Sequence, residues 1–508
     1  MSVAGSSDVN DELAKTQWDV VVTGLGPVGT TLCSLLGKYG LRILGVDREK
    51  SIYTLPRAGH VDHTVLRTFE EIGCLDELLA EMIPNRGMEL LNGNHDVLAR
   101  IPTIRRTPSN LPPSMHLHQP VLERLLRENA ERIEGVTLRN SMRLVSFEPT
   151  GGLQRVALEH EGRTFSVTTR FLVGCDGASS VTRNVAGLGF RDYGFAESWV
   201  VIDLILKEIP ESLRRDTTFV ADPKRPYAMI EMPGMRYRFE FMVLPGESVA
   251  SVVKESTVLR LISKWLHPHQ VQKVERAIVY TFRGAQAEHW RRGSVAIAGD
   301  AAHLTPPFLG QGLCSGVRDA ANLAWKIAFV LSGRLPESIL DTYGIERGPH
   351  VDNVITTSIE IARNLCMLDE TAAQERDRQM LQSGLPEEKR IRFKLGELRT
   401  GPLIMPSGGM YAARPVSASK KTDSSLDRKF VILARSETAL SSKASINWWR
   451  ALGSEIQILD ALDEAAAELD AWLQRLRGNV AVIRPDKYVL GCEKELDDIT
   501  RYVQSNLN

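Results

Sequence analysis

A glycine-rich segment near the N-terminus limits the folds that this chain can adopt. Gly24-Leu25-Gly26-Pro27-Val28-Gly29 follows the apolar run Trp18–Thr23 and precedes a stretch of helical periodicity that reaches about Tyr39. A continuous apolar run is typical of a strand buried on both faces of a parallel sheet. The G-x-G-x-x-G spacing therefore predicts a strand, a turn and a helix that bind the pyrophosphate of a dinucleotide.

Each glycine of this segment has its own expected role. Gly24 permits the tight turn, Gly26 lets the backbone approach the pyrophosphate, and Gly29 lets the helix pack on the strand. Free N–H groups and the dipole at the start of the helix favour an anion at this point. The alternative interpretation is a glycine-rich turn without a ligand.

Asp47 narrows the expected ligand. It ends a second apolar strand, Arg42–Val46, at roughly the distance where such folds place the acid that binds a ribose hydroxyl. A carboxylate there accepts hydrogen bonds from the sugar and repels a 2′-phosphate. We therefore expect an adenosine ribose, as in NAD or FAD.

Two further segments lie far downstream. Gly174-Cys175-Asp176-Gly177 opens a stretch that ends at Arg183, and Gly299-Asp300-Ala301-Ala302-His303 precedes Pro307 and the Gly310-Gln311-Gly312 sequence. Each motif alone is weak. The three together, in this order, indicate FAD as the ligand.

Composition excludes several classes of function. The 508 residues are 43% hydrophobic and 25% charged with a net charge of −1, which suits a globular protein of two to four domains without a nucleic-acid partner. Met1–Gln17 is polar and acidic, so we expect a disordered arm and no signal peptide. Charges interrupt the apolar stretches, so we expect no membrane span and a cytoplasmic location.

The six cysteines form no C-x-x-C pair and no cluster with histidines at metal-ligand spacing. We therefore predict reduced thiols and no metal site.

Changes in periodicity divide the chain into an α/β protein of several units. A Rossmann-like FAD-binding domain holds an inserted, mainly antiparallel β-sheet substrate domain. After a linker rich in Pro, Gly and Ser comes a small α/β domain that resembles a thioredoxin-like fold without its redox cysteines. The expected bounds are 1–17 for the arm, 18–190 and 283–400 for the FAD-binding domain, 191–282 with part of 85–115 for the substrate domain, 401–427 for the linker and 428–508 for the last domain.

The three motifs together resemble those of the class A flavoprotein monooxygenases, the single-component aromatic hydroxylases. The resemblance covers about Trp18–Thr400, and the C-terminal extension is similar to that of phenol hydroxylase and 3-(3-hydroxyphenyl)propionate hydroxylase. It implies noncovalent FAD, NADH or NADPH as a transient reductant, and O₂. The cofactor-binding residues that it implies are Gly24, Gly26, Pro27, Gly29, Asp47, Arg48, Arg57, Gln119, Asp176, Asp300, Pro307, Gly310, Gly312 and Leu313.

The same resemblance implies a reaction. In this class a flavin C4a-hydroperoxide hydroxylates a phenolic or related electron-rich ring. The alternatives are another FAD-dependent oxygenation on this fold, with a ring-opening, polyketide or N-heteroaromatic substrate, or a non-catalytic flavin-binding sensor. We expect a small aromatic substrate and a monomer or homodimer.

Candidate substrate-site residues come from two places. By the resemblance, Asp62 is the catalytic base, and its alternative role is to cap the helix that begins there. Tyr227, Tyr237 and Phe239 alternate along predicted strands and either face the flavin or pack within the sheet. His303 belongs to the third motif, where structural packing is the favoured role. Arginines available for a carboxylate-bearing substrate are Arg105, Arg106, Arg236 and Arg238.

Overall fold

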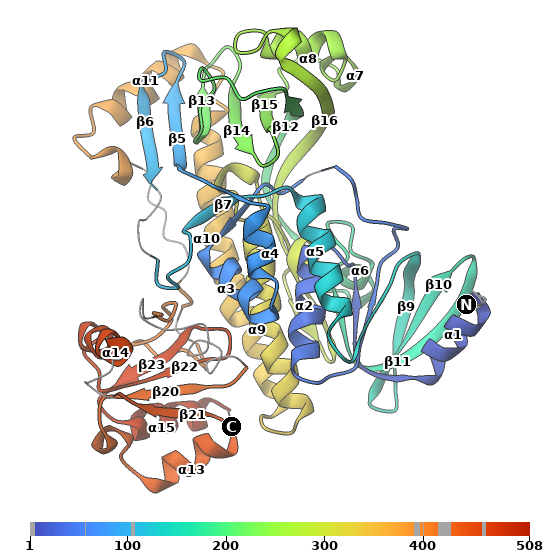
Figure 1. Ribbon diagram of the computed structural model, residues 1–508, viewed down its shortest axis with the longest axis vertical. Coiled ribbons are helices and arrows are strands. Elements are labelled where there is room, and N and C mark those ends of the chain that lie inside the picture. The colour runs from blue at the N-terminus through green and yellow to red at the C-terminus, as the bar shows by residue number, and fades with distance from the viewer. Residues whose placement is uncertain are drawn as a thin grey trace.

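The computed structural model describes residues 6–55, 57–102, 107–390, 397–399, 401–414, 428–459 and 464–507. Figure 1 shows a central unit of helices around a mostly parallel sheet, a second sheet at the top of the view and a small α/β unit at the lower left. Arg105, Arg106 and the 415–427 part of the expected linker lie outside the described residues.

Three strands of the central unit's sheet lead into the three glycine-rich segments. Val20, Val21 and Val22 have no exposed surface, as expected for a strand covered on both faces. The strand order is β17 (Arg291–Arg292), β18 (Val295–Ile297), β11 (Arg163–Gly174), β1 (Gln17–Thr23), β2 (Ile43–Val46) and β8 (Val136–Arg139). In addition, β10 (Leu153–His160) pairs antiparallel with β11, and β9 (Met142–Thr150) pairs antiparallel with β10.

Helices and a small sheet complete this unit. The helices are α2 (Pro27–Lys38), α3 (His63–Ile72), α4 (Leu75–Ala80), α5 (Gln119–Glu131), α6 (Val181–Ala186) and α9 (Gly312–Leu331). The small sheet has the order β3 (His60–Asp62), β7 (Ser114–His116) and β4 (Ile83–Pro84). It continues directly into α3 and forms a wall beside the start of α9.

The expected disordered arm is wrong for Ser6–Lys15, which forms helix α1 against β11. Leu13 is 3% exposed, and the Trp18 indole donates to its carbonyl at 3.2 Å. Asn10 Oδ1 bonds His160 Nδ1 on β10 at 2.9 Å. A buried leucine and hydrogen bonds to neighbouring elements therefore stabilise the helix. The overall polar composition of the segment gave no indication of these contacts. Residues 1–5 lie outside the described part of the chain.

The second sheet is antiparallel apart from the β13–β5 pair. Its order is β19 (His303–Leu304), β16 (Val271–Gln286), β12 (Arg191–Leu206), β15 (Arg236–Met242), β14 (Tyr227–Met232), β13 (Thr217–Ala221), β5 (Gly87–Asn92) and β6 (Val97–Pro102). Its strands thus come from 191–286, from 87–102 and from the third motif. α7 (Val249–Val252) and α8 (Glu255–Ile262) adjoin it in Figure 1, while α10 (Thr342–Leu365) contacts β16 and β13 and α11 (Glu370–Leu381) contacts β6.

The C-terminal unit has a four-stranded sheet with order β21 (Glu455–Ile458), β20 (Val431–Ala434), β22 (Val480–Ile483) and β23 (Val489–Glu493), together with helices α13 (Lys443–Ala451), α14 (Glu464–Arg475) and α15 (Leu496–Leu507). The preceding segment 401–414 is not a free linker. Met405 N donates to Leu490 O at 2.7 Å, and Ala412 N donates to Lys487 O at 2.8 Å. Backbone pairing with this unit orders a segment whose composition is typical of a loop.

Buried charges join the C-terminal unit to the central unit. Arg484, with no exposed surface, donates to Glu346 on α10 at 2.8 Å and to Asp486 at 2.6 Å. Lys326 on α9 donates to the same Glu346 oxygen at 2.9 Å. Burial alone would raise the pKa of Glu346, but the positive charges of Arg484 and Lys326 lower it to about 2. The carboxylate is therefore ionised across the neutral range.

Arg484→Leu should destabilise the protein strongly, because it removes one of two cations around Glu346 and leaves Asp486 without its ion-pair partner. Breaking a buried pair in this way costs about 3–5 kcal/mol. The free energy of unfolding from urea titration measures the effect. Arg435→Leu is the control, because Arg435 and Asp470 form a half-exposed pair in the same unit and should contribute about 1 kcal/mol or less. Equal losses in the two variants would contradict the structural role of the buried network.

Candidate active site

A cavity of about 1490 Å³ connects the central unit with the second sheet. Ligand sites for small molecules are typically about 300–1,000 Å³, so this space has room for a dinucleotide and a second molecule. Its walls include backbone of all three glycine-rich segments, the small sheet and one face of the second sheet. The cavity is thus the place where the sequence motifs meet.

The first segment forms a cradle beside the second. Gly24 has φ +91°, and a Cβ there would lie 2.3 Å from the Cys175 carbonyl oxygen. A Cβ on Gly29 would lie 1.9 Å from the Gly24 carbonyl oxygen, so packing requires glycine at both positions. A Cβ on Gly26 meets nothing within 4 Å, and Gly26 and Pro27 line the cavity at the start of α2. Open space at a helix N-terminus fits a pyrophosphate.

Asp47 lies at the end of β2, as expected, and fixes the same turn. Its Oδ2 accepts from Leu25 N at 2.8 Å, its Oδ1 accepts from Glu49 N at 2.9 Å, and Arg127 lies 3.5 Å away. Arg48 is largely exposed and pairs with Glu49. Neither Asp47 nor Arg48 lines the cavity. Their expected contacts with the adenosine therefore stay predictions.

Asp176 braces its own turn and does not reach the cavity. It accepts from Thr182 N at 3.0 Å and from Thr182 Oγ1 at 3.1 Å. The neighbouring Gly177 and Ala178 line the cavity instead. Arg183, to which the sequence assigned no role, donates to Ala178 O at 2.8 Å and to Ala301 O at 2.9 Å. This buried guanidinium joins the second segment to the third.

The third segment exposes one carboxylate to the cavity. Asp300 lines the cavity and makes no side-chain hydrogen bond with any residue that the structure describes. The segment is held from behind by buried Asp319, which accepts from Gly299 N at 3.1 Å and from His303 Nε2 at 2.7 Å. His303 is 1% exposed and does not line the cavity, so it acts as a structural residue.

Pro307, Gly310, Gly312 and Leu313 line the cavity where α9 begins, so the positive end of the helix dipole faces it. The adjacent wall is closely fitted. His60 Nδ1 donates to Gly310 O at 3.0 Å, and a Cβ on Gly310 would lie 3.1 Å from that nitrogen.

Gln119 and Arg57 also line the cavity, but the Gln119 amide is engaged. Its Oε1 accepts from Arg57 N at 3.2 Å and from Ala58 N at 2.6 Å, and its Nε2 donates to Glu123 at 2.6 Å. Gln119 therefore positions the Arg57–Ala58 backbone, while the Arg57 side chain is exposed. Both residues were expected to bind the cofactor, and that role stays a prediction.

Asp62 is the N-cap of α3, and the structure does not support its assignment as the base. Oδ1 accepts from Thr64 N at 3.0 Å, and Oδ2 forms an ion pair with buried Arg318. Burial alone would raise the pKa of Asp62, but the Arg318 charge and the Thr64 hydrogen bonds hold it well below the ordinary value. A carboxylate stabilised in this way is a weak base.

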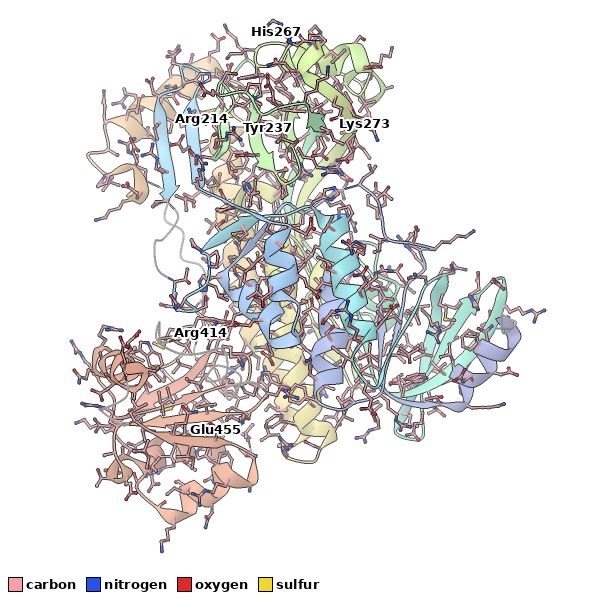
Figure 2. All side chains as sticks on the ribbon, in the orientation of Figure 1. Arg214, Tyr237, His267, Lys273, Arg414 and Glu455 are labelled. Atoms are coloured by element: carbon pink, nitrogen blue, oxygen red, sulfur yellow. The ribbon has the colours of Figure 1, made fainter. Side chains whose placement is uncertain are left out.

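The expectation that Tyr227, Tyr237 and Phe239 face the flavin is wrong. These side chains lie on the far face of the second sheet, where Tyr227 and Phe239 pack against Trp265 after α8. Figure 2 shows Tyr237 within this sheet unit close to Arg214, whose carbonyl oxygen accepts from the Tyr237 hydroxyl at 2.8 Å. None of the three lines the cavity.

The opposite face of β15 points Arg238 and Glu240 into the cavity. Arg238 is paired with Asp203 at 2.7 Å, and Arg236 with Glu275 at 3.0 Å, so neither of these two candidate arginines is free for a substrate carboxylate. The alternation of side chains along β15 could have indicated Arg238 and Glu240 as site residues. It does not show which of the two faces points into the cavity, because that depends on which face α8 covers.

Other expectations concern metals, thiols and membranes. Within the described part of the chain, no three His, Cys, Asp or Glu side chains gather as a metal site would require, and the six cysteines are free. No helix among the described residues is long and apolar enough to cross a membrane.

Comparison with known proteins agrees with the site. The family model described as "FAD binding domain" matches residues 17–358. A probable NADH-specific resorcinol 4-hydroxylase of Rhodococcus jostii is 33% identical over 95% of this chain and 93% of its own length. A 3-(3-hydroxy-phenyl)propionate/3-hydroxycinnamic acid hydroxylase of Mycolicibacterium gilvum is 31% identical over 94% and 89%. The structure of the flavin-dependent monooxygenase PieE shares the fold, with a TM-score of 0.79, 19% identity and coverage of 97% and 99%.

The chain therefore belongs to the FAD-binding family of class A flavoprotein monooxygenases, the FAD-dependent aromatic hydroxylases. The cradle at Gly26 and the unbonded Asp300 carboxylate fit the phosphates and the ribityl hydroxyls of that cofactor.

Asp300→Ala should weaken FAD binding, because Asp300 is a carboxylate free to accept ribityl hydroxyls. Losing a charge-assisted hydrogen bond costs about 1.5–3 kcal/mol, which is roughly a 10- to 150-fold higher Kd. Quenching of flavin fluorescence on titration measures the affinity. Asp11→Ala, an exposed change on α1 outside the cavity, should leave the Kd unchanged. An unaltered Kd in Asp300→Ala would remove Asp300 from the cofactor site.

Asp62→Asn should lower stability by about 3–5 kcal/mol, because it leaves the buried Arg318 charge without its partner. Since the folded-state pKa of Asp62 is below its unfolded value, the ion pair contributes stability above about pH 4 and loses it as the pH falls further. Urea unfolding at several pH values should therefore show the wild-type advantage shrinking below pH 4.

The control for that variant is Asp369→Asn, because Asp369 caps α11 on the surface by accepting from Ala372 N at 2.7 Å. Asparagine caps about as well as aspartate, so this change should be nearly neutral. A stable Asp62→Asn enzyme that reduces O₂ to hydrogen peroxide without hydroxylating would restore Asp62 as the base.

Proposed function

We propose that this protein hydroxylates a small phenol, of the resorcinol or phenol type, with NADH as the electron donor. The observation that carries the proposal is that the three cofactor segments line the same cavity as a sheet wall that bears charged side chains. Hydroxylase relatives of similar length with phenolic substrates in their names, one of them NADH-specific, support the substrate and donor.

Bound FAD would supply the activation of O₂: with two electrons from NADH, one oxygen atom would enter the ring and the other would leave as water. The protein's own residues bind, orient and exclude water. We infer that Asp47 meets the adenosine ribose, that Asp300 meets the ribityl chain, and that the start of α9 at Gly312 stabilises negative charge on the cofactor. Aromatic and aliphatic side chains such as Phe219, Ile230 and Phe308 give the substrate end of the cavity an apolar lining that excludes water.

We also infer that the C-terminal unit is a thioredoxin-like domain without thiol chemistry. Its sheet joins a parallel β20–β21 pair to two antiparallel strands, with helices between and after them. The only cysteine among its described residues, Cys492, is buried, and burial raises the pKa of its thiol to about 12. A thiol that is not ionised at neutral pH is a poor redox nucleophile.

The FAD-loaded protein should oxidise NADH faster when resorcinol is present, and should form one hydroxylated product per NADH consumed. NADH absorbance, product mass and hydrogen peroxide measure this together. Phenol and 3-(3-hydroxyphenyl)propionate test whether the side chain matters, and NADPH tests the donor. Tight FAD binding without phenol-stimulated NADH oxidation across this panel would contradict the proposal and favour the flavin-binding sensor.

A further inference from the structure

The cavity-facing side of the second sheet contains four buried charges. Asp203 on β12 accepts a hydrogen bond from Arg238 on β15 at 2.7 Å and forms an ion pair with Arg276 on β16 at 2.6 Å. Arg238 also donates to Arg57 O at 2.9 Å, which ties the cluster to the cofactor wall. Two cations thus share one carboxylate, and the fourth charge, Glu240, balances the remaining positive charge.

The two carboxylates of the cluster differ in their partners. Asp203 contacts both arginines, whereas the Glu240 carboxyl group accepts no hydrogen bond from any residue that the structure describes. Arg238 Nη1 lies 3.9 Å from Glu240 Oε1. The direct neighbours of Glu240 in the sheet are apolar, Val201 on β12 and Ala228 on β14. The residue is 5% exposed and lines the cavity.

Because no described protein group donates to the Glu240 carboxyl group and the residue lines the cavity, its hydrogen bonds must come from molecules inside the cavity. The cavity is the side from which a donor can arrive. A phenol supplies such a donor, since its ring hydroxyl is both a hydrogen-bond donor and an acid. Phe219, in the strand after next, and Ile230 offer apolar contacts for the ring beside it.

We propose that Glu240 binds the ring hydroxyl of the aromatic substrate and acts as the base that removes its proton, an inference that rests on the proposed function. The phenol O–H bond breaks and a carboxyl O–H bond forms on Glu240, with no change in oxidation state. Before transfer the cluster of Asp203, Glu240, Arg238 and Arg276 is neutral. Afterwards its excess positive charge lies beside the phenolate, which it stabilises.

The electrostatics of the cluster suit this role. Burial raises the pKa of Glu240 above its ordinary value; Arg238 and Arg276 oppose the rise and Asp203 adds to it. A base works best when its pKa approaches the working pH. Because the ionised form is needed, substrate deprotonation should increase as the pH rises through this elevated pKa and then level off. Asp62, in contrast, is held ionised by Arg318.

Glu240→Gln tests the chemical step, because the amide keeps the shape but cannot take the proton. With both proteins loaded with FAD to the same stoichiometry, kcat/KM for resorcinol hydroxylation should fall by about 10²–10⁴-fold, and hydrogen peroxide per NADH should rise. The acidic limb of the wild-type pH profile should disappear. Glu89→Gln is the matched control: Glu89 is a buried carboxylate of the same sheet on the opposite face, paired with Arg100, and should leave the pH profile and coupling unchanged.

A phenol that is already ionised at neutral pH, such as a nitrophenol, separates base catalysis from positioning. It needs no base, so the ratio of wild-type to Glu240→Gln rates should be much smaller for it than for resorcinol. An equal loss with both substrates would assign Glu240 to positioning only and overturn the proposed proton transfer.

Binding of a phenol can also be measured without turnover, and it tests whether Glu240 recognises the ring hydroxyl. The absorbance change of bound flavin reports the Kd for a phenol and for its methyl ether, which lacks the hydroxyl donor. The wild type should prefer the phenol by about tenfold or more, and Glu240→Leu should lose that preference. A preference that survives in Glu240→Leu would overturn the role of Glu240, whereas a lost preference without hydroxylation would fault only the proposed reaction.

Discussion

Adjacent parallel strands with a common carboxyl edge are the constraint on which the site depends. β18, β11 and β1 are neighbours, with Gly174 paired to Thr23 on one side and to Ile297 on the other. Each strand continues directly into one of the three glycine-rich segments. Cys175 N donates to Thr23 O at 2.7 Å, and Ala298 N donates to Gly174 O at 2.9 Å, so the sheet pairing extends into the turns. Segments separated by more than a hundred residues therefore meet at one edge, where open α/β sheets bind their ligands.

Local sequence was sufficient to predict the glycine turns that line this site. Glycine is required at Gly24 and Gly29 because a Cβ there would collide with the backbone of Cys175 or of Gly24 itself. Such steric requirements appear in the sequence as the G-x-G-x-x-G spacing. The cap formed by Asp62 is equally local, since its acceptors serve Thr64 and Val65. Its partner Arg318 lies 256 residues away and carries no local signal, so the sequence left both the cap and the base open. Segment 401–414 was mistaken for a linker for the same reason, because its order comes from backbone pairing with Val489–Leu490 and Lys487.

The substrate side was harder because strand alternation has two phases. Along β15, Tyr237 and Phe239 alternate with Arg238 and Glu240, and both pairs are buried. Hydrophobicity suggests that aromatic rings line an aromatic site, but in this sheet they form the core under α8 and Trp265. The charged pair faces the cavity, and the register with β12 and β16 brings Asp203 and Arg276 to it. A one-residue change of phase would exchange the two faces, and only tertiary packing decides between them.

Helix α9 connects the cavity with the C-terminal unit. The helix begins at the cavity with Gly312, and its Asn322 donates to Glu346 at 2.8 Å and to Asp486 of the C-terminal unit at 3.1 Å. One turn later Lys326 meets the same Glu346. A second tie lies nearer the cavity, where Arg67 on α3 donates to Ala412 O at 3.0 Å. The same helix thus carries Gly312 at the cavity and, further along, the buried contacts of Asn322 and Lys326. The C-terminal unit therefore packs, through buried polar contacts, against α3, α9 and α10, and α3 and α9 both reach the cavity.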